Sequence, residues 1–454
     1  MKNLMTKLLG MTALVGIFAG ALAAFPGWMD PPSRNNTHDP RNHPHHKVPQ
    51  IDPGIAGPTS TPPPVGCRVQ PAQNALVQAN NAFAVDLYGA LARTLAPSDN
   101  LAYSPFSVST ALDMAWSGAA GQTASQMATV LHLQGDPAVI GTQVQQLLGS
   151  LASSAANHLT FTVGDSLWLN SNIAFSSAYL AQMRQYYGAT AQSLSFADGP
   201  AVVSLINQWV ADSTDQLIKG ILGPRDVQPT SVAFLLNAVL LEAGWQSPFL
   251  AQNTAQQAFT CGDGSVTTTA MMKQTNQYYY AEGPDAQVLE MPYQGGDFSL
   301  LVLLPTDGSS LTALESGLTP AGLDSRIRGL CPQLVAVKFP KLSLALGPVN
   351  LVQELRGLGM TDAFTGTANF SPMSASGNSD FHIEIVKHAA VVQVDEGGIK
   401  AAAVTVIGYA INAVSGPPPN LVQFNANHPF LFLVRQNSTG SILFMGRVNN
   451  PNQP

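Results

Sequence analysis

Hydrophobic and polar residues alternate in two different ways along residues 75–454. Apolar residues first recur at the three- and four-residue spacing of helices, and later in the short continuous or alternating runs that are typical of strands. Helices are predicted at 76–92, 104–119, 124–133, 205–218 and 351–360, and strands at 159–169, 232–245 and 334–346. A hairpin is predicted over 287–305, with its turn at Gly295-Gly296. This mixture predicts an α+β fold with a large, mostly antiparallel sheet.

The first 23 residues have the pattern of a secretory signal peptide. Lys2 and Lys7 flank the start of an apolar run over 8–23 that ends in small residues, as signal cleavage requires. We therefore expect cleavage after residue 23 and a secreted or periplasmic protein without a membrane anchor, because the apolar run is short for a membrane span. The composition of this segment favours a bacterial origin, with a eukaryotic secreted origin as the alternative.

Residues 24–74 are rich in Pro and lack apolar periodicity, so we predict a disordered linker before a single domain at 75–454. Four histidines lie in this linker, and a loose transition-metal site there is the less favoured interpretation. These histidines are His38, His43, His45 and His46.

The composition narrows the function classes. Hydrophobic residues make up 45% of the 454 residues, enough for a large core, whereas Lys and Arg total only 20 and the net charge is −7. Nucleic acid is therefore not an expected partner. Cys67, Cys261 and Cys331 permit one disulfide, whose pairing the sequence leaves open, and at least one thiol stays free or pairs between chains. No cysteine or histidine spacing suggests zinc, and we expect no metal and no cofactor.

The segment at 394–406, VDEGGIKAAAVTV, has the alternation of a strand but almost no bulky side chains. One face would carry Ile399, Ala401, Ala403, Thr405 and Ile407, and the other Lys400, Ala402, Val404 and Val406. A segment that can extend but packs little by itself suits late insertion between strands that are already in place.

This segment and the closing block HPFLFLVRQNSTGSILFMGRVNNP, 428–451, resemble the hinge and C-terminus of the serpin family. Further blocks resemble that family in the same order, namely 100–133, 206–222 and 237–249, so the resemblance extends over 75–454. It implies the serpin fold, with a large, mostly antiparallel central sheet, additional sheets, about eight or nine helices and an exposed reactive-centre loop.

The resemblance also implies roles for individual residues. A hydrogen-bonded cluster under the opening sheet would contain Ser104, Ser107, Asn237 and His388, and Trp245 would lie where the loop first enters the sheet. Each of these would otherwise be an ordinary buried residue. The hinge would consist of Glu396, Gly397, Gly398, Ile399, Lys400, Ala401, Ala402, Ala403 and Thr405.

A serpin is not an enzyme but a monomeric inhibitor that a protease attacks as a substrate, giving a covalent acyl-enzyme complex. Counting from Gly398 places the scissile bond at Asn412–Ala413, with Ile411 and Val414 as flanking candidates. No Arg or Lys lies nearby, so elastase-like or subtilisin-like serine proteases are favoured. Ile411 would also suit a papain-like cysteine protease.

Two departures from the family pattern keep a second function open. Glu242-Ala243 replace the usual Lys-Gly, and Ile399-Lys400 replace a small polar residue and Glu. Bulky or charged hinge residues favour a non-inhibitory serpin that binds or chaperones another molecule, whereas the three alanines favour an inhibitor. The block at 164–167 spells the GDSL of some hydrolases, but no His follows an Asp by three residues, so we expect no hydrolase.

Overall fold

The computed structural model describes residues 66–69, 71, 73–96, 98–155, 159–378, 381–399 and 421–453. The predicted signal peptide, most of the predicted linker and the hinge and loop from Lys400 to Val414 lie outside these residues. The described α-helices are α1 (Ala75–Thr94), α2 (Pro105–Trp116), α3 (Gly121–Val130), α4 (Pro137–Ala155), α5 (Ser177–Tyr187), α6 (Gly199–Ser213), α7 (Leu311–Ser316), α8 (Pro320–Arg328) and α9 (Val352–Gly357).

The strands form two sheets. Those of the six-stranded sheet, in spatial order, are β10 (Leu342–Asn350), β11 (Lys387–Val394), β12 (Gly398–Ile399), β4 (Ala233–Gly244), β2 (Leu159–Asn170) and β3 (Thr190–Leu194). Those of the nine-stranded sheet are β1 (Leu101–Tyr103), β15 (Ile442–Val448), β14 (Phe430–Gln436), β8 (Phe298–Pro305), β7 (Ala286–Pro292), β6 (Val266–Glu282), β9 (Cys331–Pro340) and β13 (Val422–Asn425), with β5 (Ala255–Thr260) on β6. The pairs β2–β3 and β9–β13 are parallel and the others antiparallel. The predicted α+β architecture is confirmed.

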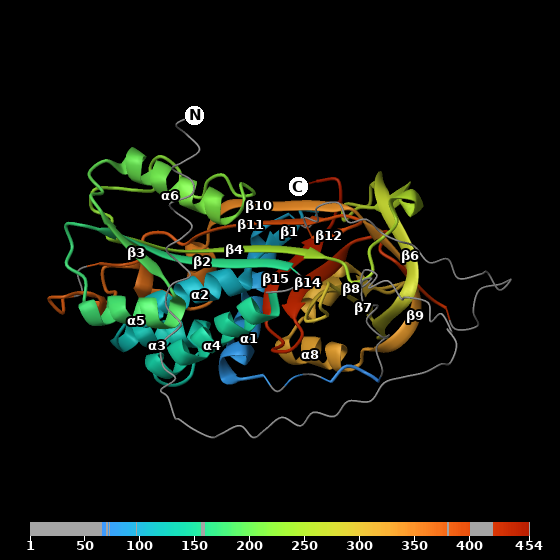
Figure 1. The fold of residues 1–454 in the computed structure, drawn as a ribbon, viewed down its shortest axis with the longest axis horizontal. Helices are drawn as coiled ribbons and strands as arrows, with labels where there is room; N and C mark the ends of the chain where they lie inside the picture. The colour runs from blue at the N-terminus through green and yellow to red at the C-terminus, as the bar shows by residue number, and fades with distance from the viewer. Residues whose placement is uncertain are drawn as a thin grey trace, which may run out of the picture. The chain divides into compact units, whose positions relative to one another are not determined.

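Helices cover both faces of the six-stranded sheet. Figure 1 shows α6 on one side of β2 and β4 and α2 on the other. Under α6, Trp168 and Phe234 pack with Ile206 in a separate hydrophobic cluster. Helix α2 begins where the sequence predicts, because the Ser104 hydroxyl accepts the Ser107 N–H at 3.1 Å and Pro105 fits the first helical position.

Two predicted elements differ most from the structure in their bounds. The strand predicted at 334–346 is two strands in different sheets, because β9 ends at Pro340 and β10 begins at Leu342. Proline has no N–H to continue a ladder. The helix predicted at 205–218 is α6, which starts earlier because the Asp198 side chain caps it. It stops at Ser213, and Asp215 and Gln216 then adopt positive φ angles of 47° and 63°.

A disulfide joins Cys67 to Cys331 at the start of β9, and Cys261 is a buried free thiol. The neighbouring Arg68 forms an ion pair with Glu290, whose side chain is fully buried, and its guanidinium lies 4.5 Å from the centroid of the Tyr279 ring. The C-terminal end of the segment interpreted as a linker is therefore attached to the body of the protein.

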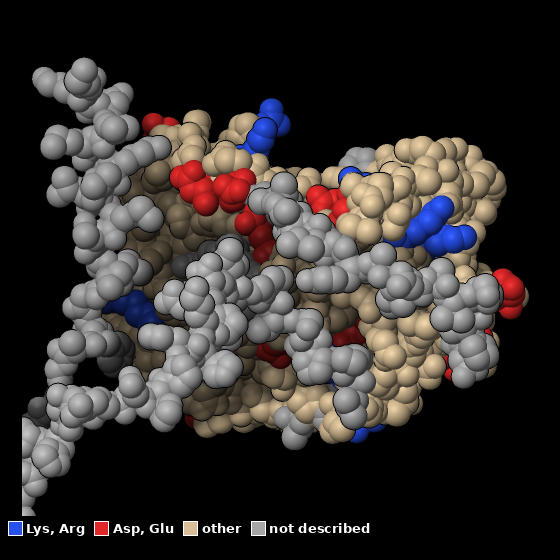
Figure 2. Space-filling view, turned by 45° about the vertical axis from the view of Figure 1, so that its right-hand side comes forward, with Lys and Arg blue, Asp and Glu red and all other residues tan. Residues whose placement is uncertain are grey.

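The described surface carries few charges. On the face in Figure 2, Lys and Arg side chains are sparse and most of the described surface belongs to uncharged residues. Among the described residues, no helix has both the length and the apolar character that a membrane crossing needs.

Candidate functional site

The six-stranded sheet contains a gap that we call the slot, between β4 and β11. At its upper end, the two residues of β12 lie between these strands: Gly398 pairs with Gly244, and Ile399 pairs with both Ala243 and Val394. Below Ile399, no ladder pair joins β4 to β11 within the described residues. The lower end of the slot lies at Ala233 and Lys387. Below Ile399, the two strands are therefore not hydrogen-bonded to each other within the described residues.

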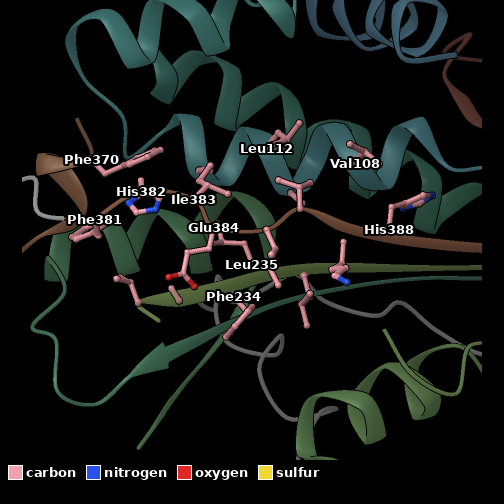
Figure 3. A pocket seen from close by; sticks show the side chains of 18 of the residues that line it. Val108, Leu112, Phe234, Leu235, Phe370, Phe381, His382, Ile383, Glu384 and His388 are labelled. Carbon is pink, nitrogen blue, oxygen red and sulfur yellow. The ribbon is translucent and has the colours of Figure 1, made fainter. Parts of the chain in front are cut away.

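Cavities lie along the slot. One of about 20 Å³ lies below Ile399, between Leu240 and Val391. A larger one of about 90 Å³ lies in the lower half, between α2, β4 and the segment at 381–388. Figure 3 shows that its walls are mainly apolar, with α2 on one side and β4 on the other. The labelled apolar residues are Val108, Leu112, Phe234, Leu235, Phe370, Phe381 and Ile383. Voids of this kind cost packing energy, which an incoming strand would restore.

Trp245, directly after β4, holds the hinge at the upper end of the slot. Its backbone N–H donates to the Gly397 carbonyl at 2.7 Å, and its indole Nε1–H donates to the Asp395 carbonyl at 2.9 Å. The indole is 1% exposed and stacks on Tyr293, with ring centroids 4.7 Å apart. The two hydrogen bonds bind Trp245 to both sides of the turn at 395–397.

Glu396 anchors the same turn from the other side. Its carboxylate accepts a hydrogen bond from Lys341 Nζ at 2.8 Å and another from the Thr254 hydroxyl at 2.8 Å. Burial acts to raise the pKa of Glu396, but these two hydrogen bonds, a backbone hydrogen bond and the charge of Lys341 together outweigh it and hold the pKa below its usual value. Glu396 is therefore ionised at neutral pH and fixes the start of the hinge.

Gly398 occupies a position that only glycine can take. Its φ is +147°, and a Cβ there would overlap the backbone oxygen of Ala243 and lie 2.8 Å from the Cα of Gly244. The Asp395 carboxylate accepts the N–H groups of Gly397 at 2.8 Å and Gly398 at 3.2 Å. Ile399, directly after it, is 6% exposed. The chain thus enters the slot through a glycine in close contact with β4.

The predicted polar cluster is brought together in part. The backbone N–H of Ser104 donates to Nε2 of His388 at 3.1 Å, and the Ser104 hydroxyl donates to the Leu443 carbonyl at 2.8 Å. Ser107 donates its N–H to Ser104. Burial lowers the pKa of His388 to about 4, so the imidazole is neutral and can accept the Ser104 bond. Asn237 lies in β4 opposite Asp165, but its side chain lies outside the described part.

The described residues contain no accessible hydrolase nucleophile at the GDSL block and no metal site. Ser166, of the GDSL block, is fully buried and accepts a hydrogen bond from Trp168 Nε1 at 2.8 Å, so no substrate can reach it. No group of three metal-binding side chains occurs in the described ranges. The four linker histidines lie outside them.

Several residues that hold the hinge were absent from the sequence prediction. Asp395, Lys341, Thr254 and Tyr293 all contact the turn or Trp245. Asp395 could have been found, because it precedes the glycines and Asp commonly accepts nearby backbone N–H groups. Lys341 and Thr254 are 55 and 142 residues from Glu396, so no local pattern indicates them.

Comparisons with known proteins agree with this geometry. The family model described as "Serpin (serine protease inhibitor)" matches residues 78–451. An uncharacterized serpin-like protein of Thermococcus kodakarensis is 34% identical over 83% of this chain and 86% of its own length. The crystal structure of Serpin48 from the insect Tenebrio molitor superposes with a TM-score of 0.73 at 28% identity, over 83% of this chain and 98% of that chain. The crystal structure of human thyroxine-binding globulin in complex with thyroxine superposes with a TM-score of 0.74 at 25% identity, over 83% of this chain and 98% of that chain.

Proposed function

The chain belongs to the serpin family, and from that premise we propose that it inhibits a serine protease by trapping it as a covalent acyl-enzyme. Serpins are generally protease inhibitors rather than catalytic enzymes. The observation that carries the proposal is the pair of hinge residues between β4 and β11, at the top of a slot whose two strands share no ladder below them.

The register of the hinge residues predicts which residues would lie opposite one another if insertion continued. Antiparallel pairing with both neighbours would bring residue 401 opposite Leu241 and Val392, and residue 403 opposite Val239 and Ala390. Ala390 and Val392 are almost fully buried, at 2% and 3%. Small side chains at Ala401 and Ala403 would fit against them without pushing the strands apart, which supports an inhibitor.

The proposed chemistry is that of the protease. Its serine hydroxyl attacks the carbonyl carbon of Asn412, the bond to Ala413 breaks, and the new amine leaves with a proton. The acyl group stays on the serine oxygen. Insertion of the freed hinge into the slot would carry the protease with it and distort its active site before water removes the acyl group. The outcome is a race between insertion and deacylation, so any feature that slows insertion favours simple cleavage.

The class of target follows from the residues around the proposed bond. Ile411, Asn412, Ala413 and Val414 offer no basic side chain for a trypsin-like pocket. Small and aliphatic residues suit elastase-like or subtilisin-like enzymes. A papain-like cysteine protease is the second candidate, because Ile411 offers an apolar residue directly before the scissile one.

A non-inhibitory binding protein is the competing function. Ile399 is bulky and already buried in the slot, and thyroxine-binding globulin is a structural neighbour crystallised with a small ligand. The apolar walls of the slot cavity are compatible with that function too. The alanines at 401–403 weigh against it, since a hinge that never inserts has no need of small residues.

We further propose that the protein is exported after cleavage at residue 23 and acts as a monomer without a cofactor. The relatives compared are archaeal and eukaryotic, so a bacterial origin remains a prediction from the signal peptide alone.

The proposal is tested by incubating the mature protein with elastase, subtilisin, chymotrypsin and papain, followed by denaturing gels. A band that survives denaturation at the summed mass is expected with at least one serine protease. The mass of the released C-terminal peptide gives the scissile bond. Cleavage by every protease without such a band, and without a rise in the melting midpoint of the cleaved protein, would refute trapping in favour of the binding function.

A further inference from the structure

Two side-chain contacts cross the lower end of the slot. We propose that they form a latch which must open before an inserting strand can reach that end. The first contact joins Lys387 to Asp226, and the second joins Glu384 to Ser231. The inference rests on the proposed insertion of the hinge, and it adds the step that limits how far and how fast the sheet opens.

The first contact is an ion pair between β11 and the connection from α6 to β4. Lys387 Nζ lies 3.1 Å from Asp226 Oδ2, and their side chains are only 18% and 20% exposed. The same Asp226 oxygen accepts the Gly223 N–H at 2.7 Å, which fixes the carboxylate toward the slot. Solvent screens an exposed ion pair strongly, but this one is shielded over most of its surface. The pair therefore resists separation of the two sides.

The second contact lies below the first. The Ser231 hydroxyl donates to a Glu384 carboxylate oxygen at 2.9 Å, and Ser231 is 1% exposed. Figure 3 shows the Glu384 side chain reaching from the segment before β11 toward β4. A hydrogen bond to a charged acceptor is stronger than one between neutral groups. Breaking this bond without replacement would leave a buried hydroxyl without its acceptor.

The β4 side of the latch is held firmly to the sheet. The Asn170 side-chain amide at the end of β2 donates to the carbonyls of Pro229 and Ser231, at 3.1 and 2.9 Å. The Asn170 backbone N–H donates to the Val232 carbonyl at 2.9 Å. Because the connection is fixed to β2, it cannot follow β11 as the slot widens. Opening must therefore break the latch rather than carry it along.

The latch lies in the path of the incoming strand. Extending the registers of Gly398 and Ile399 down the slot brings residue 411 opposite Ser231 and residue 409 opposite Glu384. A strand inserted as far as the proposed scissile bond would thus pass between the two partners of the second contact. Residue 406 would lie beside Lys387. The upper half of the slot can fill with the latch closed, but the last few residues cannot.

The consequence is a gate on the final third of insertion. A closed latch stabilises the uninserted state and is lost in the inserted one, so it slows spontaneous insertion while the loop is intact. A closed latch also slows the trapping of the protease. The latch must therefore be weak enough for insertion to finish before deacylation. The first contact joins Lys387 and Asp226, and the second joins Ser231 and Glu384. Replacing any one of these polar side chains changes few apolar contacts.

The experiment compares variants that open the latch with matched controls. Lys387→Met removes the first contact, and Asp226→Asn keeps an acceptor for Gly223 but removes the charge. Ser231→Ala removes the second contact together with the hydrogen bond that the Ser231 hydroxyl accepts from the Gln228 N–H at 3.1 Å. Lys387→Arg keeps the cation, and Lys273→Met removes a lysine of the other sheet that has no ion pair in the described residues. The uncut proteins are held somewhat below their melting midpoint, and the rate of conversion to a heat-resistant monomer is followed on native gels.

We expect Lys387→Met, Asp226→Asn and Ser231→Ala to convert roughly three- to tenfold faster than the wild type. Lys387→Arg and Lys273→Met should convert at the wild-type rate. The double variant of Lys387 and Asp226 should be no faster than either single one, since both remove the same pair. The melting midpoint of the loop-cleaved form should be unchanged in the Lys387 and Asp226 variants, because the inserted state has no latch. Ser231→Ala is compared by its conversion rate alone, since it also loses the Gln228 hydrogen bond.

Conversion of the three opening variants at the wild-type rate would overturn the latch, as would an equal acceleration by Lys273→Met. A fall in the midpoint of the cleaved form of the Lys387 and Asp226 variants would show that these residues only stabilise the fold, which also overturns it. If the cleaved wild type gains no stability at all, the proposed insertion itself fails, and this result is separable because it needs no variant.

Discussion

The sharpest prediction concerns the glycine at the top of the slot. In Gly398→Ala, the new Cβ would collide with the backbone at Ala243 and Gly244, and neither can rotate away. The φ of +147° adds strain that any non-glycine residue would carry, about 1–3 kcal/mol. The hinge should therefore leave the slot, because movement of 397–399 is easier than movement of the central strand β4.

The cost of withdrawal can be worked from the contacts that are lost. The Trp245 N–H would lose the Gly397 carbonyl, and the ladder pairs of β12 would go, at about 1 kcal/mol for each hydrogen bond. Ile399, now 6% exposed, would return to water at about 2 kcal/mol. The sum of these terms exceeds 3 kcal/mol, and a penalty of only about 3 kcal/mol on the first step of insertion would slow it roughly a hundredfold. Deacylation would then win the race, and the inhibitor would become a substrate.

The assay is the number of moles of Gly398→Ala needed to inactivate one mole of protease, measured beside its melting midpoint. Gly347→Ala, in β10 of the same sheet, is the matched control, because a Cβ there meets nothing within 4 Å. We expect the first variant to be cleaved with little trapping and to melt a few degrees lower, and the control to behave as wild type. An unchanged stoichiometry for Gly398→Ala would refute both the close approach to β4 and its place at the start of insertion.

Three more predictions follow from the same geometry. Ala403→Arg, or Thr405→Arg, should convert the inhibitor into a substrate, because insertion would bury an unpaired charge at a cost of several kcal/mol; unchanged trapping on gels would mean that the register is different. Burial lowers the pKa of His388 to about 4, so as the pH falls the unfolded chain binds the proton before the folded chain does. The free energy of unfolding should therefore fall by about 3 kcal/mol between pH 6.5 and pH 4, and should not change through this group above pH 6.5. In His388→Gln, the melting midpoint should fall less steeply as the pH is lowered. Reduction of the Cys67–Cys331 disulfide, which spans 264 residues, should destabilise the fold by about 5 kcal/mol through the unfolded state. It should do so equally in intact and loop-cleaved protein, and a difference between the two melts would show that the disulfide acts on insertion.

The architecture could be predicted from sequence because its strands and helices carry strong local signals. Ser104 and Pro105 indicate the start of α2, and the glycines at 295–296 mark the turn between β7 and β8, both with positive φ. The split at Pro340 was missed, although proline is a strand-ending signal, because apolar residues continue on both sides of it. The choice of sheet for each half depends on partners far along the chain.

The sequence predicts the parts of the site that depend on backbone conformation and on the size of side chains. It does not predict the parts that depend on residues far along the chain. Gly398 and the alanines after it stand out because small residues in an extended segment need an explanation. The disulfide could not be assigned, since three cysteines allow three pairings and only the fold selects Cys67 with Cys331. The Arg68–Glu290 ion pair spans 222 residues, and the contacts of Lys387 and Glu384 depend on the connection after α6.

Insertion needs a source of free energy, and several features of the described core destabilise the uninserted state. Asp113 in α2 is 1% exposed, neither of its carboxyl oxygens has a hydrogen-bond partner among the described residues, and burial raises its pKa well above the usual value. The hydroxyl of Tyr293, beside Trp245, is also buried and has no hydrogen-bond partner within the described part of the chain. Each such group costs about 1–3 kcal/mol, and the slot cavities add lost packing. A filled slot would add ladder bonds along the 12 residues of β4, on the order of 10 kcal/mol. We therefore expect the uninserted state to be less stable than the inserted one but to persist, because the latch at Lys387 must open before the strand can reach the lower end of the slot.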